Sequence, residues 1–174
     1  MLMQDDVTSV RSLEPADAGQ FKALRLRAID SSPTSFWPTR SEEEARTPKE
    51  VEGRIRATTL QAVFGVFAGA ALIGIAGIRR DALVQVRHKA TVWGVYVEPA
   101  HRGRGIARTL VTTAIAHASE NWNIAQVQLC VNTENAAARH LYAAIGFSTF
   151  GVEPRSMQVG GKFYDEEHMV LNLR

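Results

Sequence analysis

Residues 95–108 read VYVEPAHRGRGIAR, an apolar strand followed by a short turn, a glycine-rich loop and the start of a helix. Gly103 and Gly105 lack a Cβ, so the backbone there can adopt unusual dihedral angles and approach a ligand closely. A loop of this kind turns several backbone N–H groups toward one point, at the positive end of a helix dipole. The stretch therefore predicts an anion site, and phosphate is the anion most often bound at such a place.

Three arginines surround this loop, namely Arg102, Arg104 and Arg108. Guanidinium groups suit phosphate oxygens, although a solvated basic turn would have the same composition. Two common nucleotide motifs are excluded. No Lys-Ser or Lys-Thr pair follows the second glycine, as a Walker loop requires, and Arg108 stands where a dinucleotide fingerprint needs a third glycine or alanine.

A second informative stretch, residues 125–147, reads AQVQLCVNTENAAARHLYAAIGF. Residues 125–131 alternate between apolar and polar side chains, as a strand does. A polar segment then leads into a helix over residues 134–145, which Gly146 ends before Phe147 opens another strand.

Both stretches resemble motifs of the GCN5-related N-acetyltransferases, the GNAT family. Arg102-x-x-Gly105-x-Ala107 resembles the family's acyl-CoA loop, and the residues before it look like the family's fourth strand. The run N-x-x-A-x-x-L-Y-x-x-x-G-F resembles its motif B, carried here by Asn135, Ala138, Leu141, Tyr142, Gly146 and Phe147. Together the motifs span about a third of the chain.

The whole sequence predicts an α+β order of elements. A helix beginning at Pro15 and Asp17 has an apolar stripe of Phe21, Leu24, Leu26 and Ile29, and a second helix begins at Ser41-Glu42-Glu43-Glu44. Two further helices are expected at 105–119 and 134–145. Strands are expected near 7–13, 60–68, 71–80, 88–97, 125–131, 147–153 and 163–173, with a turn near Gly69-Ala70.

The resemblance implies the same fold class, α+β in an α/β three-layer arrangement. The family's central sheet is mixed and mostly antiparallel, with about seven strands, flanking helices and splayed fourth and fifth strands. The chain of 174 residues is expected to form a single N-acetyltransferase domain over residues 1–174.

The resemblance also implies which residues hold acetyl-CoA. The pantetheine arm would lie between the splayed strands and pair with the main chain of residues 95–97, and the loop at 102–107 would hold the pyrophosphate. The expected cofactor-binding residues are Val95, Tyr96, Val97, Arg102, Gly103, Arg104, Gly105, Ile106, Ala107, Arg108 and Asn135. No metal site is expected.

Acetyl transfer from a thioester to an amine needs a neutral amine, an aligned pair of reactants, donors for the developing oxyanion, and a proton or donor for the leaving thiolate. By the resemblance, Tyr142 lies beside the CoA sulfur and acts as the general acid. Read on its own, Tyr142 is better explained as a half-buried aromatic that packs a helix on the sheet, and Asn135 before it and Gly146-Phe147 after it are what favour the acid role. Asn135 has a second interpretation as a helix cap, which is compatible with ligand binding.

The general base and the acceptor stay open at this stage. Glu98 follows the fourth strand, Glu42–Glu44 lie near the family's acceptor region with a solvated helix face as the favoured interpretation, and residues 165–168 read DEEH. Scattered histidines or a water chain are further alternatives. The segments expected to shape the acceptor pocket are 30–45 and 153–164, in which Phe36, Trp37 and Tyr164 would form walls or simply pin loops to the core.

Composition narrows the class of protein. The formal net charge of +2 is too small to argue for nucleic acid. The run from 62 to 78 is interrupted by glycines and is short for a membrane span. The start MLMQDD does not read as a signal peptide, so a cytoplasmic protein is expected. Cys130 is alone in an apolar strand, and we expect a buried, inert thiol.

The predicted function is that of an N-acetyltransferase, which moves the acetyl group of acetyl-CoA to a primary amine by direct attack in a ternary complex. The acceptor would be a small molecule or a protein N-terminus, with no nucleic acid or membrane as partner. A homodimer is expected because members of the family often form dimers. The alternative is a non-catalytic module of the same fold that senses acyl-CoA.

Overall fold

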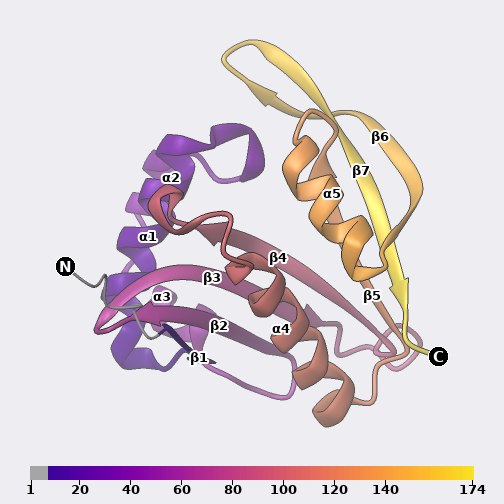
Figure 1. Ribbon diagram of the computed structural model, residues 1–174, viewed down its shortest axis with the longest axis horizontal. Helices are drawn as coiled ribbons and strands as arrows, with labels where there is room; N and C mark the ends of the chain where they lie inside the picture. The colour runs from indigo at the N-terminus through magenta and orange to yellow at the C-terminus, as the bar shows by residue number, and fades with distance from the viewer. Residues whose placement is uncertain (1–7) are drawn as a thin grey trace.

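The computed structural model describes residues 8–174, and it forms one seven-stranded sheet with the strand order β1-β2-β3-β4-β5-β7-β6 (Figure 1). The expected strand at 7–13 is shorter, and its first residue, like the MLMQDD segment, lies outside the described residues. The strands are β1 Thr8–Ser12, β2 Gln61–Ala68, β3 Ala71–Arg80, β4 Lys89–Val97, β5 Gln126–Asn132, β6 Ser148–Val159 and β7 Lys162–Asn172.

All neighbouring strands run antiparallel except β4 and β5. These two are parallel, and their pairing covers only Lys89–Thr91 opposite Gln126–Gln128. Beyond Thr91 the strands part, and the rest of β4 has no partner on that side among the strands of the sheet. The expectation of a mixed, mostly antiparallel sheet of seven strands with splayed fourth and fifth strands is confirmed.

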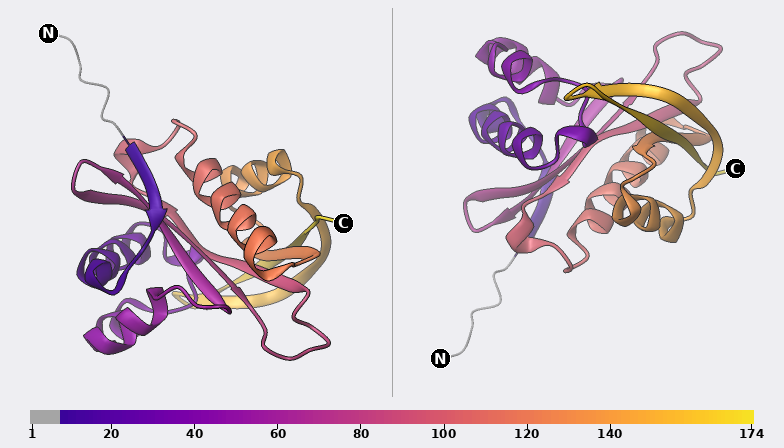
Figure 2. Two further views of the ribbon diagram at one scale, coloured as in Figure 1. Left: turned by 90° about the horizontal axis from the view of Figure 1, so that it is seen from below. Right: turned by 90° about the horizontal axis from the view of Figure 1, so that it is seen from above.

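Helices cover both faces of the sheet, as the views along its edge show (Figure 2). Helices α1 and α3 pack on one face, and α4 and α5 pack on the other. The helices are α1 Ala18–Ser31, α2 Arg40–Glu44, α3 Pro48–Ile55, α4 Ile106–Trp122 and α5 Ala136–Ile145, with 3₁₀ turns at Pro15–Asp17, Pro33–Ser35 and Pro99–His101.

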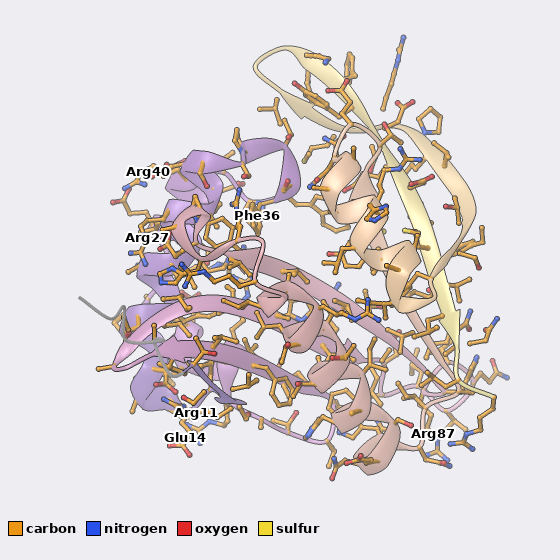
Figure 3. The ribbon with its side chains drawn as sticks, viewed as in Figure 1. Arg11, Glu14, Arg27, Phe36, Arg40 and Arg87 are labelled. Atoms are coloured by element: carbon orange, nitrogen blue, oxygen red, sulfur yellow. The ribbon has the colours of Figure 1, made fainter. Side chains whose placement is uncertain are left out.

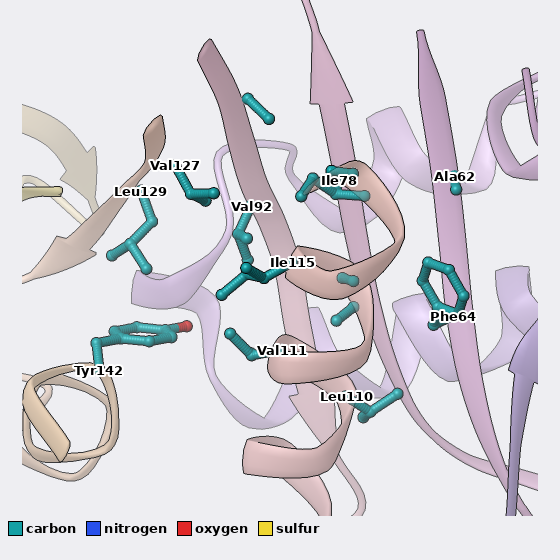
Figure 4. Close-up of a cluster of buried hydrophobic side chains, with 14 of the residues drawn as sticks. Ala62, Phe64, Ile78, Val92, Leu110, Val111, Ile115, Val127, Leu129 and Tyr142 are labelled. Carbon is teal, nitrogen blue, oxygen red and sulfur yellow. The ribbon is translucent and has the colours of Figure 1, made fainter. Parts of the chain in front are cut away.

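Each face of the sheet has its own hydrophobic core. Leu110 and Val111 of α4 pack with Ile78 of β3 and Val127 of β5 in the larger core (Figure 4). On the other face, α1 packs with α3 and with the opposite side of β2, β3 and β4. Strand residues therefore alternate between two buried faces of the sheet, and β4 contributes side chains to the hydrophobic core on each face.

The first helices differ from the expectation in one respect. The stripe predicted for α1 included Leu26, but this residue is only half-buried and Arg25 is buried instead. The reason is an ion pair with Glu43, which allows a charged side chain to occupy an inward position of the helix. The segment after Ser41 also forms two helices rather than one, because Thr47 and Pro48 begin a new helix with a capping box to Glu50.

The C-terminal hairpin is longer than the sequence predicted. The strand expected at 147–153 continues to Val159, and the connection to β7 is a tight turn at Gly160-Gly161. The segment 153–164 is therefore mostly paired strand and not a loop. Its register shifts between Glu153 and Met157, where Arg155 has a φ of +54°.

Candidate active site

The opening between β4 and β5 forms a cavity of about 310 Å³. It brings together seven of the residues assigned to cofactor binding and catalysis, which lie on β4, α4 and α5 and in the segments that precede the two helices. Five others lie in the adjoining loop and helix start outside the cavity wall, namely Gly103, Arg104, Gly105, Ile106 and Arg108. The predicted residues in the wall are Val95, Tyr96, Val97, Arg102, Ala107, Asn135 and Tyr142.

A bulge in β4 shapes one wall of this cavity. Ala76 of β3 faces two residues of β4, Gly94 and Val95, and Gly94 has a φ of +65°. A glycine in the left-handed region at the first position of a bulge is the arrangement that adds a residue to one strand and bends it. The prediction from sequence did not include this bulge, although an isolated glycine in an apolar strand was available as its signal.

The glycine-rich loop leaves its backbone donors unused. Gly103 and Gly105 have φ values of +75° and +76°, and Gly105 precedes the first turn of α4 without a capping side chain. The N–H groups of residues 103–108 make no hydrogen bond with any residue in the range 8–174. Free amides at a helix N-terminus attract anions, so the predicted phosphate site has the required donors.

Arg102 binds the strand that precedes it. Its Nε donates to the carbonyl oxygen of Val97 at 2.9 Å, and its guanidinium lies 5.4 Å from the centre of the Tyr96 ring. The Val97 carbonyl is thus already engaged within the protein. Ile106 is 7% exposed and belongs to the core, so its contribution to a ligand is limited to its backbone amide.

The Tyr142 side chain extends from α5, and its hydroxyl points toward Val92 of β4 and Val111 of α4 (Figure 4). Its ring packs edge-on against Phe147 at 5.9 Å between ring centres. Burial among apolar side chains raises the pKa of Tyr142 to about 12. The phenol is therefore protonated at neutral pH and can serve as a hydrogen-bond or proton donor toward the cavity.

Asn135 caps helix α5. Its Oδ1 accepts a hydrogen bond from the Ala138 amide at 3.1 Å, and its side-chain amide also lies 3.5 Å from Ser35 Oγ. The cap interpretation is confirmed. Because Asn135 also lines the cavity, the cap fixes a polar side chain at the mouth between α5 and the loop after α1.

The loop after α1 forms the part of the cavity wall that lies on the opposite face of the sheet from α5. Phe36 points inward and lies 6.3 Å from the Tyr96 ring, whereas Arg27 and Arg40 lie toward the outside of the molecule (Figure 3). Phe36 is buried and lines the cavity, and Trp37 is 67% exposed. Tyr164 does not line the cavity.

The structure separates the candidate carboxylates. Glu98 forms an ion pair with Arg27 at 2.5 Å and does not line the cavity. The favoured interpretation of Glu42–Glu44 as a solvated face is wrong for Glu43, which is fully buried and bound to Arg25 and Arg54. Burial alone would raise the pKa of Glu43, but these two guanidinium groups more than offset it and hold that pKa below its ordinary value.

The four residues 165–168 also have different surroundings. Glu167 is bound by Arg139 at 2.5 Å, and Asp165 accepts from the backbone amide of Arg155 at 2.8 Å. The His168 ring bridges Glu153 and Cys130. Glu166 alone of the four lines the cavity.

The expectation of a buried Cys130 is wrong. The residue is exposed and lines the cavity, and its Sγ lies 3.2 Å from Nδ1 of His168. Partial desolvation and the nearby carboxylates of Glu166 and Glu153 raise the pKa of the Cys130 thiol to about 11. A thiol with such a pKa is protonated at neutral pH and is a poor nucleophile.

Two kinds of feature are absent from residues 8–174. No group of three or more His, Cys, Asp or Glu side chains is placed to hold a metal ion. None of the helices in that range combines the length and the apolar character needed to cross a membrane.

Comparison with known proteins agrees with these features. The sequence model of the acetyltransferase (GNAT) family matches residues 25–147. N-alpha-acetyltransferase RimI of Mycobacterium tuberculosis is 35% identical over 97 residues, which are 56% of this chain and 58% of that protein. Spermidine N(1)-acetyltransferase of Vibrio cholerae is 30% identical over 84 residues, 48% of this chain and 49% of that protein. The chain thus spans about half the length of these curated relatives.

A solved structure resembles nearly the whole chain. An acetyltransferase of the GNAT family from Streptococcus pneumoniae has a TM-score of 0.82 to this structure and 25% sequence identity. The match covers 96% of this chain and 100% of that one. The similarity therefore extends over the sheet and both helical layers, well beyond the two sequence motifs.

Proposed function

Because the chain belongs to the acetyltransferase (GNAT) family, we propose that it transfers the acetyl group of acetyl-CoA to a primary amine. The observation that carries this proposal is the cavity between β4 and β5, with Tyr142 in its wall and a loop of unbonded amides next to it. A thioester donor with a phosphorylated tail needs both parts, an open strand edge for the arm and free donors for the phosphates.

The residues present fit such a donor. Beyond Thr91, strand β4 has an unpaired edge that faces the cavity, so the main chain of Val95 and Tyr96 is placed to bind the amide groups of a pantetheine arm. The amides of residues 103–108 would bind the pyrophosphate, with Arg104 and Arg108 as exposed cations beside them. Acetyl-CoA would supply the activated acetyl group and a thiol leaving group.

Direct transfer is favoured over an acetylated enzyme intermediate. The thiol in the cavity wall is that of Cys130, and it stays protonated at neutral pH. We therefore propose that the neutral amine attacks the thioester carbonyl carbon while both substrates are bound. The C–N bond forms, the C–S bond breaks, and Tyr142 donates its phenolic proton to the departing sulfur. The amine nitrogen releases one proton to solvent, and solvent returns a proton to the phenolate.

The names of the relatives support an amine acceptor. One is named for N(1) of spermidine, and another is named for an alpha-amino group. Both are primary amines, so the reaction class is shared although the carbon skeletons differ. We propose a primary amine of a small molecule or of a peptide N-terminus as the acceptor class.

The first experiment is a thermal-shift titration with acetyl-CoA, with ATP and NAD as controls. A ligand at 100 times its dissociation constant stabilises the folded state by about 2.7 kcal/mol, which is readily measured. A shift with acetyl-CoA alone supports the donor site, and amine-dependent release of CoA then supports catalysis. Binding without CoA release for any amine would favour the sensing module, and no shift with acetyl-CoA would contradict the donor site.

A further inference from the structure

Glu166 differs from the other buried carboxylates of the structure in having no cationic partner. Glu43 is bound by Arg25 and Arg54, and Glu167 is bound by Arg139. The Glu166 side chain instead accepts hydrogen bonds from neutral donors, Trp37 Nε1 at 3.2 and 3.3 Å and Ser156 Oγ at 2.6 Å. No Lys, Arg or His nitrogen in residues 8–174 lies within 4.0 Å of its oxygens.

A carboxylate of this kind is placed to bind a cation from outside the chain. Glu166 is 6% exposed, and it lines the cavity between β4 and β5. Burying a charge is costly unless an opposite charge or several hydrogen bonds compensate for it. Two neutral donors fix the position of the carboxylate and leave its charge available to a ligand in the cavity.

Glu166 and Tyr142 lie on opposite faces of the sheet. Along β5, Leu129 and Val131 belong to the core under α4 and α5, so Asn132 points to the opposite face of the sheet. Glu166 is the direct partner of Asn132 across β5 and β7, and directly opposed residues share a face. Tyr142 reaches the same cavity from α5. The cavity thus passes between the strands from one face to the other.

We propose that Glu166 binds the ammonium group of the acceptor on the α1 face and receives the proton that this group must lose before it attacks. The proposal rests on the acetyltransferase function proposed above, and it narrows the acceptor to an amine that is protonated at neutral pH. The proton passes from the ammonium nitrogen to a Glu166 oxygen, and the freed electron pair forms the C–N bond. The thioester carbon–sulfur bond breaks, sulfur takes a proton, and the second amine proton leaves to solvent.

Four titratable groups lie at neighbouring positions on the same face as Glu166. They are Cys130 on β5, Glu153 directly across the pair with β6, and Tyr164 and His168 two residues away on either side along β7. The thiol is protonated at neutral pH, and the His168 ring is held between Cys130 and Glu153. Among residues 8–174, Glu166 is the one carboxylate in the cavity wall.

The test compares two amines of similar shape and different charge, benzylamine and aniline. Benzylamine is protonated at neutral pH and aniline is neutral. In the Glu166→Gln variant we expect kcat/KM at pH 7 to fall by about 100-fold for benzylamine, the usual size of a lost general base, and to change little for aniline. Raising the pH should restore the variant's benzylamine activity as the free amine forms. Glu167→Gln, the same change on the next residue, is the matched control.

Each result has a defined meaning. An equal loss for both amines, unaffected by pH, would assign Glu166 a structural role and overturn the proposal, and an undiminished rate with benzylamine would do the same. If the wild type releases no CoA with any amine, the acetyltransferase function fails separately. The ammonium site is then tested by thermal shift, where benzylamine should stabilise the wild type and Glu167→Gln but not Glu166→Gln. Equal stabilisation of all three would contradict it.

Discussion

The Arg25 guanidinium and the Glu43 carboxylate form a buried bidentate ion pair that joins helix α1 to helix α2. Nε and Nη2 of Arg25 lie 3.3 and 3.2 Å from the two oxygens, and the side chains are 2% and 1% exposed. A Cβ added to Gly94 would lie 3.3 Å from Nη1 of Arg25, so the guanidinium packs against the bulge of β4. The ion pair thus supports the bent strand that lines the cavity.

Removing the charge of Glu43 should destabilise the protein strongly. In Glu43→Gln the guanidinium groups of Arg25 and Arg54 lose their common anion inside the protein, and a broken buried pair costs about 3 kcal/mol or more. Urea denaturation at pH 7 measures the loss. Glu44→Gln, an exposed neighbour, should change the unfolding free energy little. Equal stability of the two variants would contradict the importance of the pair.

The same carboxylate should make stability depend on pH in acid. The pKa of Glu43 is lower in the folded protein than in the unfolded chain, so the unfolded chain binds a proton first as the pH falls. The contribution of Glu43 is therefore complete above its unfolded pKa and is lost as the pH falls through the folded one. Denaturation curves from pH 7 to pH 3 should be less steep in pH for Glu43→Gln than for the wild type.

Local patterns predicted the parts of the fold that depend on local chemistry. The glycine-rich loop, the α5 cap and most strand positions follow from spacing along the chain. The burial of Glu43 could not be predicted this way, because its partner Arg25 is eighteen residues away and three consecutive glutamates read as a polar face. The exposure of Cys130 has a similar reason. Its face of β5 opens only because β4 diverges after three paired residues, which is a tertiary feature.

Gly105→Glu should abolish acetyl-CoA binding and leave the protein folded. A Cβ added at this position meets no atom within 4 Å, so a side chain can leave the backbone without disturbing the core, but a carboxylate would lie beside the amides proposed to bind the pyrophosphate. Gly105→Ala is the control, because it adds only the strain of a φ of +76°, about 1 kcal/mol. Isothermal titration with acetyl-CoA should show binding by the Ala variant and none by the Glu variant. Comparable affinities would place the phosphates elsewhere.

Cys130 should react slowly with iodoacetamide at neutral pH despite its exposure. With a pKa of about 11 the thiol has little thiolate at pH 7, and the rate should rise about tenfold per pH unit up to that value. Acetyl-CoA should slow the reaction because Cys130 lines the cavity. Mass spectrometry of the labelled protein follows both effects. Rapid labelling at pH 7 would show that the thiol is activated and would reopen the question of an acetylated intermediate.

Tyr142→Phe should lower turnover without lowering acetyl-CoA affinity. The phenyl ring keeps the edge-on contact with Phe147, so only the hydroxyl is lost. A missing general acid typically costs about 100-fold in rate, and we expect this loss in kcat with an unchanged dissociation constant for acetyl-CoA. Tyr164→Phe, on β7 and outside the cavity wall, is the matched control. A parallel loss in both variants would argue against a specific role for the Tyr142 hydroxyl.

The Tyr142→Phe variant should also differ from the wild type in how its stability depends on pH in alkaline solution. The pKa of Tyr142 is about 12 in the folded protein and near 10 in the unfolded chain, so the unfolded chain releases this proton first. The stability that the neutral phenol contributes is therefore complete below about pH 10 and is lost as the pH rises toward 12. Urea denaturation at pH 8 and pH 11 should show a smaller loss of stability for Tyr142→Phe than for the wild type. An identical loss would mean that the hydroxyl is better solvated than its apolar surroundings imply. That result would argue against a phenol kept as the donor for the departing thiolate.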